Sequence, residues 1–407
     1  MHEHRLRTLF RWGLWLALVA FGAVGLYLRL AYGHRLANYG SYIPWGLWVA
    51  CYIYFVGMSA GLFVIASVVL ITRTKSLLPM APLTLLCAVL TLVMALLSIG
   101  MDLGHMNRAG EVMIHANLRS MMAWMIFLYS TYMVVLLVES ALVAVPRLRP
   151  WRDLGGFRGR LARLVTRIPE DAAELWLRRL GIAGIPLAIA FSGGVGALFA
   201  TVGARPYWNH GLFPIIFLAG ALLSGAGCLA AVIFLVWPRR DETFQQGLQL
   251  LGRLMLYLLI FDTILEWAEF SIPMWQGIGH EMPIFHEILY GRFWASFWII
   301  HLLLGVAVPV VLLWRWAERP IAVAVSGALV AVTFISVRLN IVIPPLTIPL
   351  LEGLDEAYVS PRLDYTYFPS WPEWAVFAAA LAIGSTLFWV AVSLLPILPP
   401  RPEAERT

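Results

Sequence analysis

The chain consists mainly of ten long apolar runs, separated by short polar or proline-containing segments. Each run is long enough for an α-helix that crosses a hydrocarbon core about 30 Å thick. The apolar residues are continuous, whereas the strands of a membrane barrel alternate apolar and polar residues over about ten positions. The pattern therefore predicts an all-α polytopic membrane protein. The ten predicted transmembrane helices cover 11–31, 44–71, 79–101, 119–145, 180–202, 211–237, 250–272, 292–316, 319–343 and 373–397.

The composition also favours a membrane location. Of the 407 residues, 61% are hydrophobic and 13% are charged, whereas an average soluble domain contains about 25% charged residues. A soluble fold of this length has too little interior to bury so much apolar surface. The first run follows three arginines, as in a signal peptide. Because the run is long and nine more follow it, we expect an uncleaved first helix.

Lysine and arginine residues are distributed unequally between the two sides of the membrane. When the N-terminus is placed in the cytoplasm, 21 of the 29 basic residues fall on the cytoplasmic side, in agreement with the positive-inside rule. An even number of helices then puts both termini in the cytoplasm (N-in/C-in). We expect the membrane to be a bacterial cytoplasmic (inner) membrane. The net charge of +6 follows from this bias, so it does not indicate a nucleic-acid partner.

The longest cytoplasmic segment, residues 147–179, contains nine arginines. A helix over its GFRGRLARLVTRI stretch would carry apolar side chains on one face and arginines on the other. Such a helix is typical of the membrane interface, where it binds anionic lipids. Docking of a cytoplasmic protein is the alternative. The apolar face consists of Phe157, Leu161, Leu164, Val165 and Ile168.

The chain lacks the usual sequence patterns of redox cofactor sites. Its three cysteines, Cys51, Cys87 and Cys228, are scattered through apolar runs, whereas an iron–sulfur cluster needs about four clustered thiolates. A haem between helices needs histidines at matched depth, and only His301 lies deep, with no obvious partner. We therefore expect no haem, iron–sulfur cluster or metal in this chain.

Ionisable residues inside the spans gather toward the outer, periplasmic half. Each such residue costs roughly 2.5–3.5 kcal/mol at the bilayer centre by insertion scales, so it needs a structural or functional reason. Arg338 lies roughly 7–8 Å deep, because it is about five residues from the boundary, and we expect it to pair with a carboxylate. Snorkelling ends and structural ion pairs are the simpler explanation, but the asymmetry favours a polar cavity that opens outward. The outer polar residues are Asp102, His105, Arg108, Glu111, His115, Asn117, Arg119, Asp262, Glu266, Glu269, Arg338, Asn340 and Glu373.

Several segments resemble the NrfD/polysulfide-reductase membrane-subunit family. Within it, the chain is similar to the ten-helix branch typified by the membrane subunit of periplasmic uptake hydrogenases. The resemblance extends from about residue 40 to 395. It is carried by IPWGLWVACYIYFVGMSAGLFVIAS at 43–67, MDLGHMNRAGEV at 101–112, the stretch from NLRSMMAW to LYSTYMVVLLVE, FWASFWIIHLLLGVAVP at 293–309, VRLNIVI at 337–343 and YFPSWPEW at 367–374. SAGLFVIAS and SGAGCLAAVIF also echo each other faintly, as an internal duplication would.

The resemblance implies a fold and a function. The fold is a single membrane domain with a peripheral first helix, a first bundle at 44–202, a second bundle at 211–343 and a last helix at 373–397. The function is a quinone- or quinol-binding anchor subunit of a multi-subunit respiratory oxidoreductase, without prosthetic groups of its own and with menaquinone or ubiquinone as substrate. Its partners are a periplasmic ferredoxin-like iron–sulfur subunit and a catalytic subunit.

The resemblance also assigns roles to residues. Asp102 and His105 fall on the family's Asp-Leu-Gly-Arg position, and Arg338 with Asn340 on its Arg-x-Asn, so these four are the predicted quinone-binding residues. Glu139 matches the acid that ends the fourth span. We predict a proton path through Glu139, Asp262 and Glu266. His105 replaces the usual arginine and His301 replaces a common acid, so the proton route can differ from that of the family.

The main alternative is a secondary transporter, because internal repeats, acidic residues inside the spans and glycine-rich helices are also transporter features. No span is clearly broken at the midplane, however, and the acids cluster on the outer side. A haem-bearing cytochrome b subunit is the weaker alternative. The sequence names neither the partner enzyme's substrate nor the direction of electron flow.

Overall fold

The computed structural model describes residues 2–400 except 352, 358–359 and 361–362, without the side chains of residues 2–11 and 355. Three basic residues used above to assign the orientation, Arg362, Arg401 and Arg406, lie outside the described residues. In the described ranges the regular elements are all helices. Ten of them are long and apolar enough to span a membrane, so the predicted all-α polytopic fold is confirmed.

The ten long helices follow the predicted runs closely. Three begin eight to ten residues earlier than predicted, at His2, Glu170 and Glu242, because their first turns are polar and extend past the apolar run. The long helices are α1 (His2–Tyr32), α2 (Leu47–Thr72), α3 (Ala81–Asp102), α5 (Met121–Leu148), α7 (Glu170–Ala200), α8 (Phe213–Val236), α9 (Glu242–Gln276), η6 (Ser296–Ala307) continued by α11 (Val308–Trp316), α12 (Pro320–Val342) and α14 (Trp371–Leu394).

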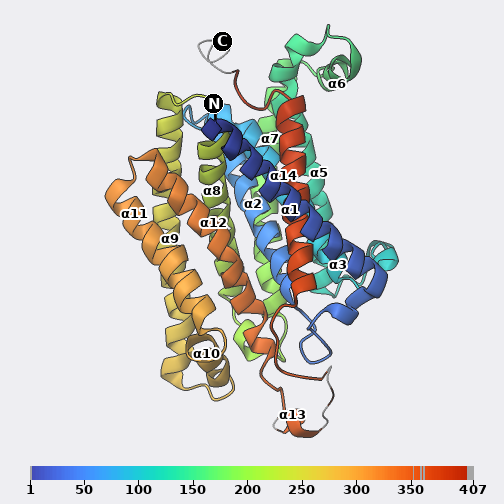
Figure 1. The fold of residues 1–407 in the computed structure, drawn as a ribbon, viewed down its shortest axis with the longest axis vertical. Coiled ribbons are helices and arrows are strands. Elements are labelled where there is room, and N and C mark those ends of the chain that lie inside the picture. Colours follow the sequence, from blue (N-terminus) through green and yellow to red (C-terminus); the bar gives the residue numbers. More distant parts are fainter. Residues whose placement is uncertain (1, 352, 358–359, 361–362, 401–407) are drawn as a thin grey trace.

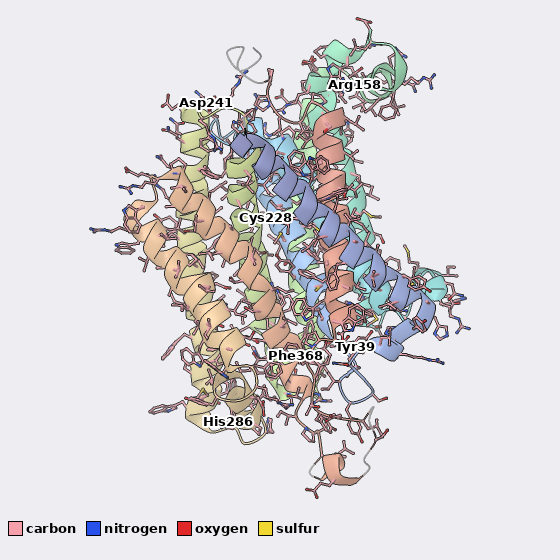
Figure 2. All side chains as sticks on the ribbon, viewed as in Figure 1. Tyr39, Arg158, Cys228, Asp241, His286 and Phe368 are labelled. Atoms are coloured by element: carbon pink, nitrogen blue, oxygen red, sulfur yellow. The ribbon has the colours of Figure 1, made fainter. Side chains whose placement is uncertain are left out.

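The start of α1 and the end of α14, which are the first and last long helices, lie at one end of the helix bundle (Figure 1). The short helix α6 (Gly156–Val165) lies at this end too, whereas α10 (Met282–Leu289) and α13 (Leu354–Ala357) lie at the opposite end. This arrangement agrees with an even number of spans. We call the end with the start of α1 the inner face and the opposite end the outer face, following the arginine distribution. In Figure 2, Arg158 marks α6 on the inner face and His286 marks α10 on the outer face.

Helices α2 and α8 pack together through glycine. A Cβ atom at Gly61 would lie 1.9 Å from the carbonyl oxygen of Ala221, and one at Gly225 would lie 2.6 Å from the backbone nitrogen of Leu62. Small residues allow such close backbone approach, which is a common way to join helices in lipid. The two segments that echo each other in sequence, SAGLFVIAS and SGAGCLAAVIF, therefore lie against one another. The division into two bundles stays a prediction.

Helix α1 runs diagonally across the front of the bundle in Figure 1 and packs against α14. Gly22 and Gly25 let its backbone approach Ala379 and Ala375. Most of the other described side chains of α1 are exposed, as a lipid-facing helix requires. Arg29 is the exception, since only 7% of its surface is exposed.

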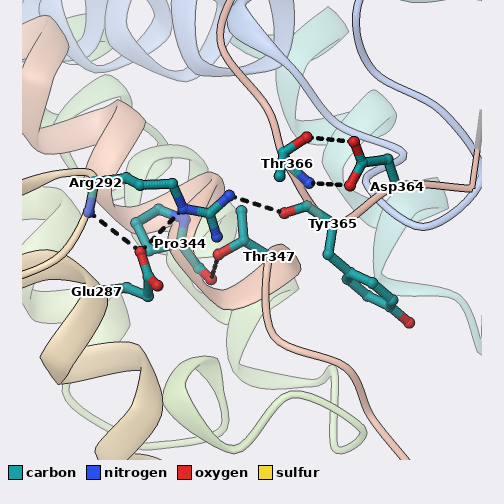
Figure 3. A network of polar contacts seen from close by, with 7 residues as sticks. All are labelled: Glu287, Arg292, Pro344, Thr347, Asp364, Tyr365 and Thr366. Carbon is teal, nitrogen blue, oxygen red and sulfur yellow. Dashed lines mark hydrogen bonds and ion pairs between the residues drawn. The ribbon is translucent and has the colours of Figure 1, made fainter. Parts of the chain in front are cut away.

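Polar contacts order the loops of the outer face (Figure 3). Arg292, which follows α10, donates from Nε to Glu287 Oε2 over 3.1 Å and from Nη1 to the carbonyl oxygen of Tyr365 over 3.4 Å. Thr366 donates to Asp364, and these hydrogen bonds lower the pKa of that carboxyl group below its usual value. The contacts connect the turn before η6 to the segment that leads into α14.

Candidate functional site

The polar residues of the outer half form two clusters. The α3 cluster consists of Arg29, His34, Tyr39, Asp102 and Glu373, and it lies where α1, α2, α3 and α14 meet. The α9 cluster lies among α8, α9, η6 and α12 and consists of Asp262, Glu266, Glu269, His301, Arg338 and Asn340.

In the α3 cluster, Asp102 is the last residue of α3. Its neighbours include the Arg29 guanidinium, the Tyr39 hydroxyl and the Glu373 carboxylate. The Oδ1 atom is buried and has no hydrogen-bond partner in the described part of the chain. An acceptor that is buried and left unpaired costs about 1–3 kcal/mol, so this atom is a candidate for binding a ligand or water.

His105 does not share this environment. It follows α3 in an exposed turn before the short helix η3 (Met106–Arg108). The structure thus brings Asp102 and His105 to the same end of α3 but places the carboxylate inside and the imidazole on the surface. Proximity in sequence suggested a pair, but the chain leaves the helix at Leu103.

Glu373, which opens α14, is fully buried and accepts several hydrogen bonds. Its Oε1 accepts from the backbone nitrogens of Asn38 at 2.9 Å and Ser370 at 3.1 Å, and its Oε2 accepts from the Tyr367 hydroxyl. Tyr367 in turn accepts from the backbone nitrogen of Leu47 at 2.8 Å. Glu373 therefore fixes the starts of α2 and α14 around Asp102. The sequence placed Glu373 on the outer side but did not predict this role, since its partner Asn38 is 335 residues away in the chain.

In the α9 cluster, His301 is paired with a carboxylate of the neighbouring helix α9. Its Nε2 lies 2.8 Å from Glu266 Oε2. His301 is carried by η6, which is wound as a π-helix, a form often found at functional sites. The sequence could not show which residue of α9 faces it. The spacing 262, 266, 269 did correctly predict that the three acids share a helix face, because all three line one cavity.

Arg338 is 1% exposed, and its guanidinium carbon lies 4.3 Å from the ring centre of Phe217 and 5.0 Å from that of Phe334. None of its three nitrogens has a hydrogen-bond partner among the residues described. The carboxylate expected beside Arg338 is therefore not hydrogen-bonded to it. Two aromatic rings occupy the adjacent space, and Asp262 interacts with the cation only electrostatically. Cation–π contacts of this kind are worth about 0.5–2 kcal/mol each.

A cavity of about 30 Å³ lies beside Asn340 and the acids of α9. This volume suits a water molecule, and it is too small for an aromatic head group. Both polar atoms of the Asn340 amide lack partners within the described structure. Arg338 and Asn340 are therefore brought together with the predicted proton-path residues Asp262 and Glu266, and they are not brought together with Asp102.

The loop before α8 adds two residues that the sequence did not single out. The buried Tyr207 lies beside Glu269; burial, together with the Glu269 and Glu266 carboxylates, raises the pKa of Tyr207 well above its usual value. His210 Nε2 lies 3.9 Å from Glu269 Oε1, which is too far for a hydrogen bond. Burial lowers the pKa of His210. Both side chains are thus held neutral near pH 7.

Glu139 lies apart from both clusters, on α5 toward the inner face. It is fully buried, and Ser67 Oγ donates to its Oε2 over 3.4 Å. Its Oε1 has no partner among the described residues. The three predicted proton-path residues therefore divide into Glu139 on one side and Asp262 with Glu266 on the other.

Comparison with known proteins identifies the family. The model of the family described as "Polysulphide reductase, NrfD" matches residues 35–350. This segment contains Asp102, Glu139, His301 and Arg338, and it excludes Arg29 and Glu373. The chain belongs to the NrfD family. The resemblance inferred from the sequence is thereby confirmed, and the protein is a multi-pass integral membrane protein.

Individual relatives are similar to this NrfD-family chain over nearly the whole length of both chains. A selenate reductase subunit of Mesobacillus selenatarsenatis is 33% identical, over 95% of this chain and 93% of the relative. The Hdr-like menaquinol oxidoreductase integral membrane subunit of Archaeoglobus fulgidus is 24% identical, over 95% of this chain and 94% of the relative. The menaquinone reductase integral membrane subunit of Nitratidesulfovibrio vulgaris is 24% identical, over 98% of this chain and 95% of the relative.

Proposed function

We propose that this NrfD-family chain is the quinone- or quinol-binding membrane anchor of a multi-subunit respiratory oxidoreductase. It exchanges electrons between the quinone pool of the membrane and an iron–sulfur partner subunit on the outer face. A third, catalytic subunit handles the other substrate. The proposal is supported by the family and by the relatives, one named as a subunit of a selenate reductase and two as integral membrane subunits of a menaquinol oxidoreductase and a menaquinone reductase.

The observation that carries the proposal is the unpaired Oδ1 atom of Asp102. Asp102 ends α3 near the outer face, where a quinone dissolved in the membrane can approach from lipid. A carboxylate there can accept a hydrogen bond from a quinol hydroxyl, and it can take up the proton that the hydroxyl loses. His105, exposed just beyond the end of α3, is placed to exchange protons with the outer solution.

The chemistry requires little from the chain itself. Each quinol that is oxidised releases two electrons and two protons. In the proposed complex, the electrons pass to the clusters of the partner subunit and the protons leave through carboxylate and imidazole groups of this chain. Transfer is most efficient when the acceptor titrates near the working pH.

We assign Arg338 and Asn340 to proton handling and no longer to the quinone itself. The unpaired polar atoms of Asn340 adjoin a water-sized cavity that also contacts Asp262 and Glu266, and Arg338 interacts electrostatically with Asp262. A bound water there would satisfy groups that are otherwise costly to bury. The Glu266–His301 pair, with a donor–acceptor distance of 2.8 Å, extends this group of polar side chains from α9 to η6. Glu139 would serve a separate step nearer the inner face.

Purification of the tagged chain from its native membranes in mild detergent tests the proposal. Mass spectrometry of the co-purifying chains should find a cysteine-rich ferredoxin-like subunit and a larger catalytic subunit. Proteolysis of intact spheroplasts should remove the ferredoxin-like subunit if it lies on the outer face. A stable preparation of this chain alone, from membranes that still reduce or oxidise quinone, would overturn the proposal.

A further inference from the structure

Helix α1 contributes the first link of a line of hydrogen bonds that ends at Asp102. Arg29 Nη2 lies 2.8 Å from His34 Nε2, His34 Nδ1 contacts the Tyr39 hydroxyl, and the Tyr39 hydroxyl interacts with the Asp102 carboxylate. In Figure 2, Tyr39 lies toward the outer end of the bundle. Arg29 and His34 lie on or just after α1, outside the segment that the family model matches.

The direction of these hydrogen bonds follows from their chemistry. A guanidinium group has donors only, so His34 Nε2 must accept the hydrogen bond from Arg29. A neutral imidazole that accepts at Nε2 carries its proton on Nδ1. His34 therefore donates from Nδ1 to the Tyr39 oxygen. The hydroxyl proton of Tyr39 is then free to point at the Asp102 carboxylate, and the line is polarised from the cation toward the acid.

Arg29 also fixes the end of α3. Its Nε donates to the carbonyl oxygen of Met101 over 2.6 Å, and its Nη2 donates to that of Leu103 over 2.8 Å. The last carbonyl groups of a helix have no partner within the helix and carry partial negative charge, so a cation there is favourable. These two bonds hold the backbone on both sides of Asp102. Only 7% of the Arg29 surface is exposed, so the contact is shielded from solvent.

The surroundings keep the line in one arrangement. The ring of Trp48 packs against all three residues, at 5.7 Å from the Arg29 guanidinium, 6.0 Å from the His34 ring and 5.8 Å from the Tyr39 ring. The other charged group facing Asp102 is Glu373 of α14. Burial, with the Asp102 and Glu373 carboxylates nearby, raises the pKa of Tyr39 far above its usual value. The phenol therefore remains a donor throughout the working pH range.

We propose that Arg29, His34 and Tyr39 are positioning residues that orient Asp102 and favour its anionic form, so that Asp102 accepts a proton from the quinol. This inference rests on the proposed function of Asp102. In the step itself an O–H bond of the quinol breaks and an O–H bond forms on Asp102, while an electron leaves the head group for the iron–sulfur partner. Asp102 then returns the proton to water at the outer face. Helix α1 is thus a required part of the site.

The pH profile of quinol oxidation by the intact complex tests this inference. Tyr39→Phe keeps the ring packing but removes the donor, so the carboxylate becomes a stronger base. The midpoint at which activity rises with pH should move upward by about 0.5–1 pH unit, as the loss of one hydrogen bond implies. His34→Phe should move it in the same direction, and His34→Asn, which keeps a side-chain N–H donor, should restore it. Arg35→Gln, an exposed neighbour, should leave the profile unchanged.

The outcomes separate this inference from the proposed function. If Asp102→Asn abolishes turnover while Tyr39→Phe and His34→Phe lower the rate equally at every pH, the residues are structural and the inference is overturned. If Asp102→Asn retains full turnover, the proposed site itself is wrong. If Tyr39→Phe does not assemble, the comparison of His34→Phe with His34→Asn gives the same test.

Discussion

The side chains of Glu266 and His301 form a hydrogen-bonded pair across two helices, with 2.8 Å between Glu266 Oε2 and His301 Nε2. Glu266 lies on the straight helix α9, and His301 lies on the π-wound η6. Side chains that are far apart in sequence are brought to the same depth by this contact. It connects the acids of α9 to the interior of the structure, beside the cavity that Asn340 also lines.

Breaking this pair on one side should destabilise the protein. His301→Leu leaves the Glu266 carboxylate without its imidazole partner, at a cost of about 1–3 kcal/mol. We expect a lower melting temperature of the detergent-purified complex, measured by intrinsic tryptophan fluorescence. The double variant Glu266→Leu/His301→Leu should recover part of the loss, because no unpaired carboxylate remains. If the stability lost in the double variant equals the sum of the losses in the two single variants, the contact contributes nothing.

Arg338 should be needed for turnover more than for folding. Arg338→Gln removes the cation but keeps a polar side chain between Phe217 and Phe334, so assembly should persist while quinone turnover falls about tenfold or more. Tenfold corresponds to about 1.4 kcal/mol of lost transition-state stabilisation. Turnover per assembled complex is the measurement, with Arg315→Gln at the inner face as the matched control. Normal turnover of Arg338→Gln would remove Arg338 from the proton path.

Gly61 should tolerate no side chain. In Gly61→Ala the new Cβ atom would lie 1.9 Å from the Ala221 carbonyl oxygen, so α2 and α8 must separate along their length. We expect a large loss of folded protein, read as the monodisperse fraction in size-exclusion chromatography. Gly13→Ala on α1 is the control, since no atom lies within 4 Å of its Cβ position. Equal yields of the two variants would contradict the described packing of α2 on α8.

His210 should make stability depend on pH. Burial lowers the pKa of His210 in the folded protein, whereas in the unfolded chain it is about 6.5. The unfolded state therefore binds the proton first, and stability falls as the pH drops below about 6.5. Melting temperatures from pH 7.5 to 5.5 should fall less steeply for His210→Asn than for the original chain. Parallel curves would show that His210 does not contribute.

The short helix α6 should bind anionic lipid. Its apolar side chains Phe157 and Leu164 are 65% and 62% exposed, and its arginines are exposed as well. We expect purified protein to retain anionic phospholipid, detected by native mass spectrometry. Arg160→Gln with Arg163→Gln should lose most of it, because each basic residue near an anionic surface contributes about 1 kcal/mol. Retention by this variant, with loss of a co-purified cytoplasmic protein instead, would favour the alternative of a protein partner.

The sequence was sufficient to predict the helices. Apolar length and breaker residues determine where a chain crosses lipid, and these signals are local. The deviations at α7 and α9 have the same cause, because hydropathy marks the apolar part of a helix and not its polar first turns. The grouping of Asp262, Glu266 and Glu269 on one face was also predictable, since the spacing within a helix is fixed.

The assignment of residues to one site was not predictable in the same way. Asp102 and Arg338 are both polar residues near the outer face, and the family resemblance implied that they share a ligand. The structure gives them different neighbours, Tyr39 and Arg29 for the first and Phe217 and Phe334 for the second. Which helix faces which is a property of packing, and no local pattern in one sequence reports it. His34 and Tyr39 were missed for this reason.

The most direct test of the account is quinol oxidation by the intact complex carrying Asp102→Asn. A soluble quinol analogue would be the donor, and reduction of the partner's iron–sulfur clusters would be followed by electron paramagnetic resonance. Asp153→Asn, an exposed carboxylate on the inner face, is the matched control. The account predicts normal assembly and a loss of about 100-fold or more in rate for Asp102→Asn, as expected when a proton acceptor is removed. A fully assembled Asp102→Asn complex that oxidises quinol at the rate of the control would contradict it.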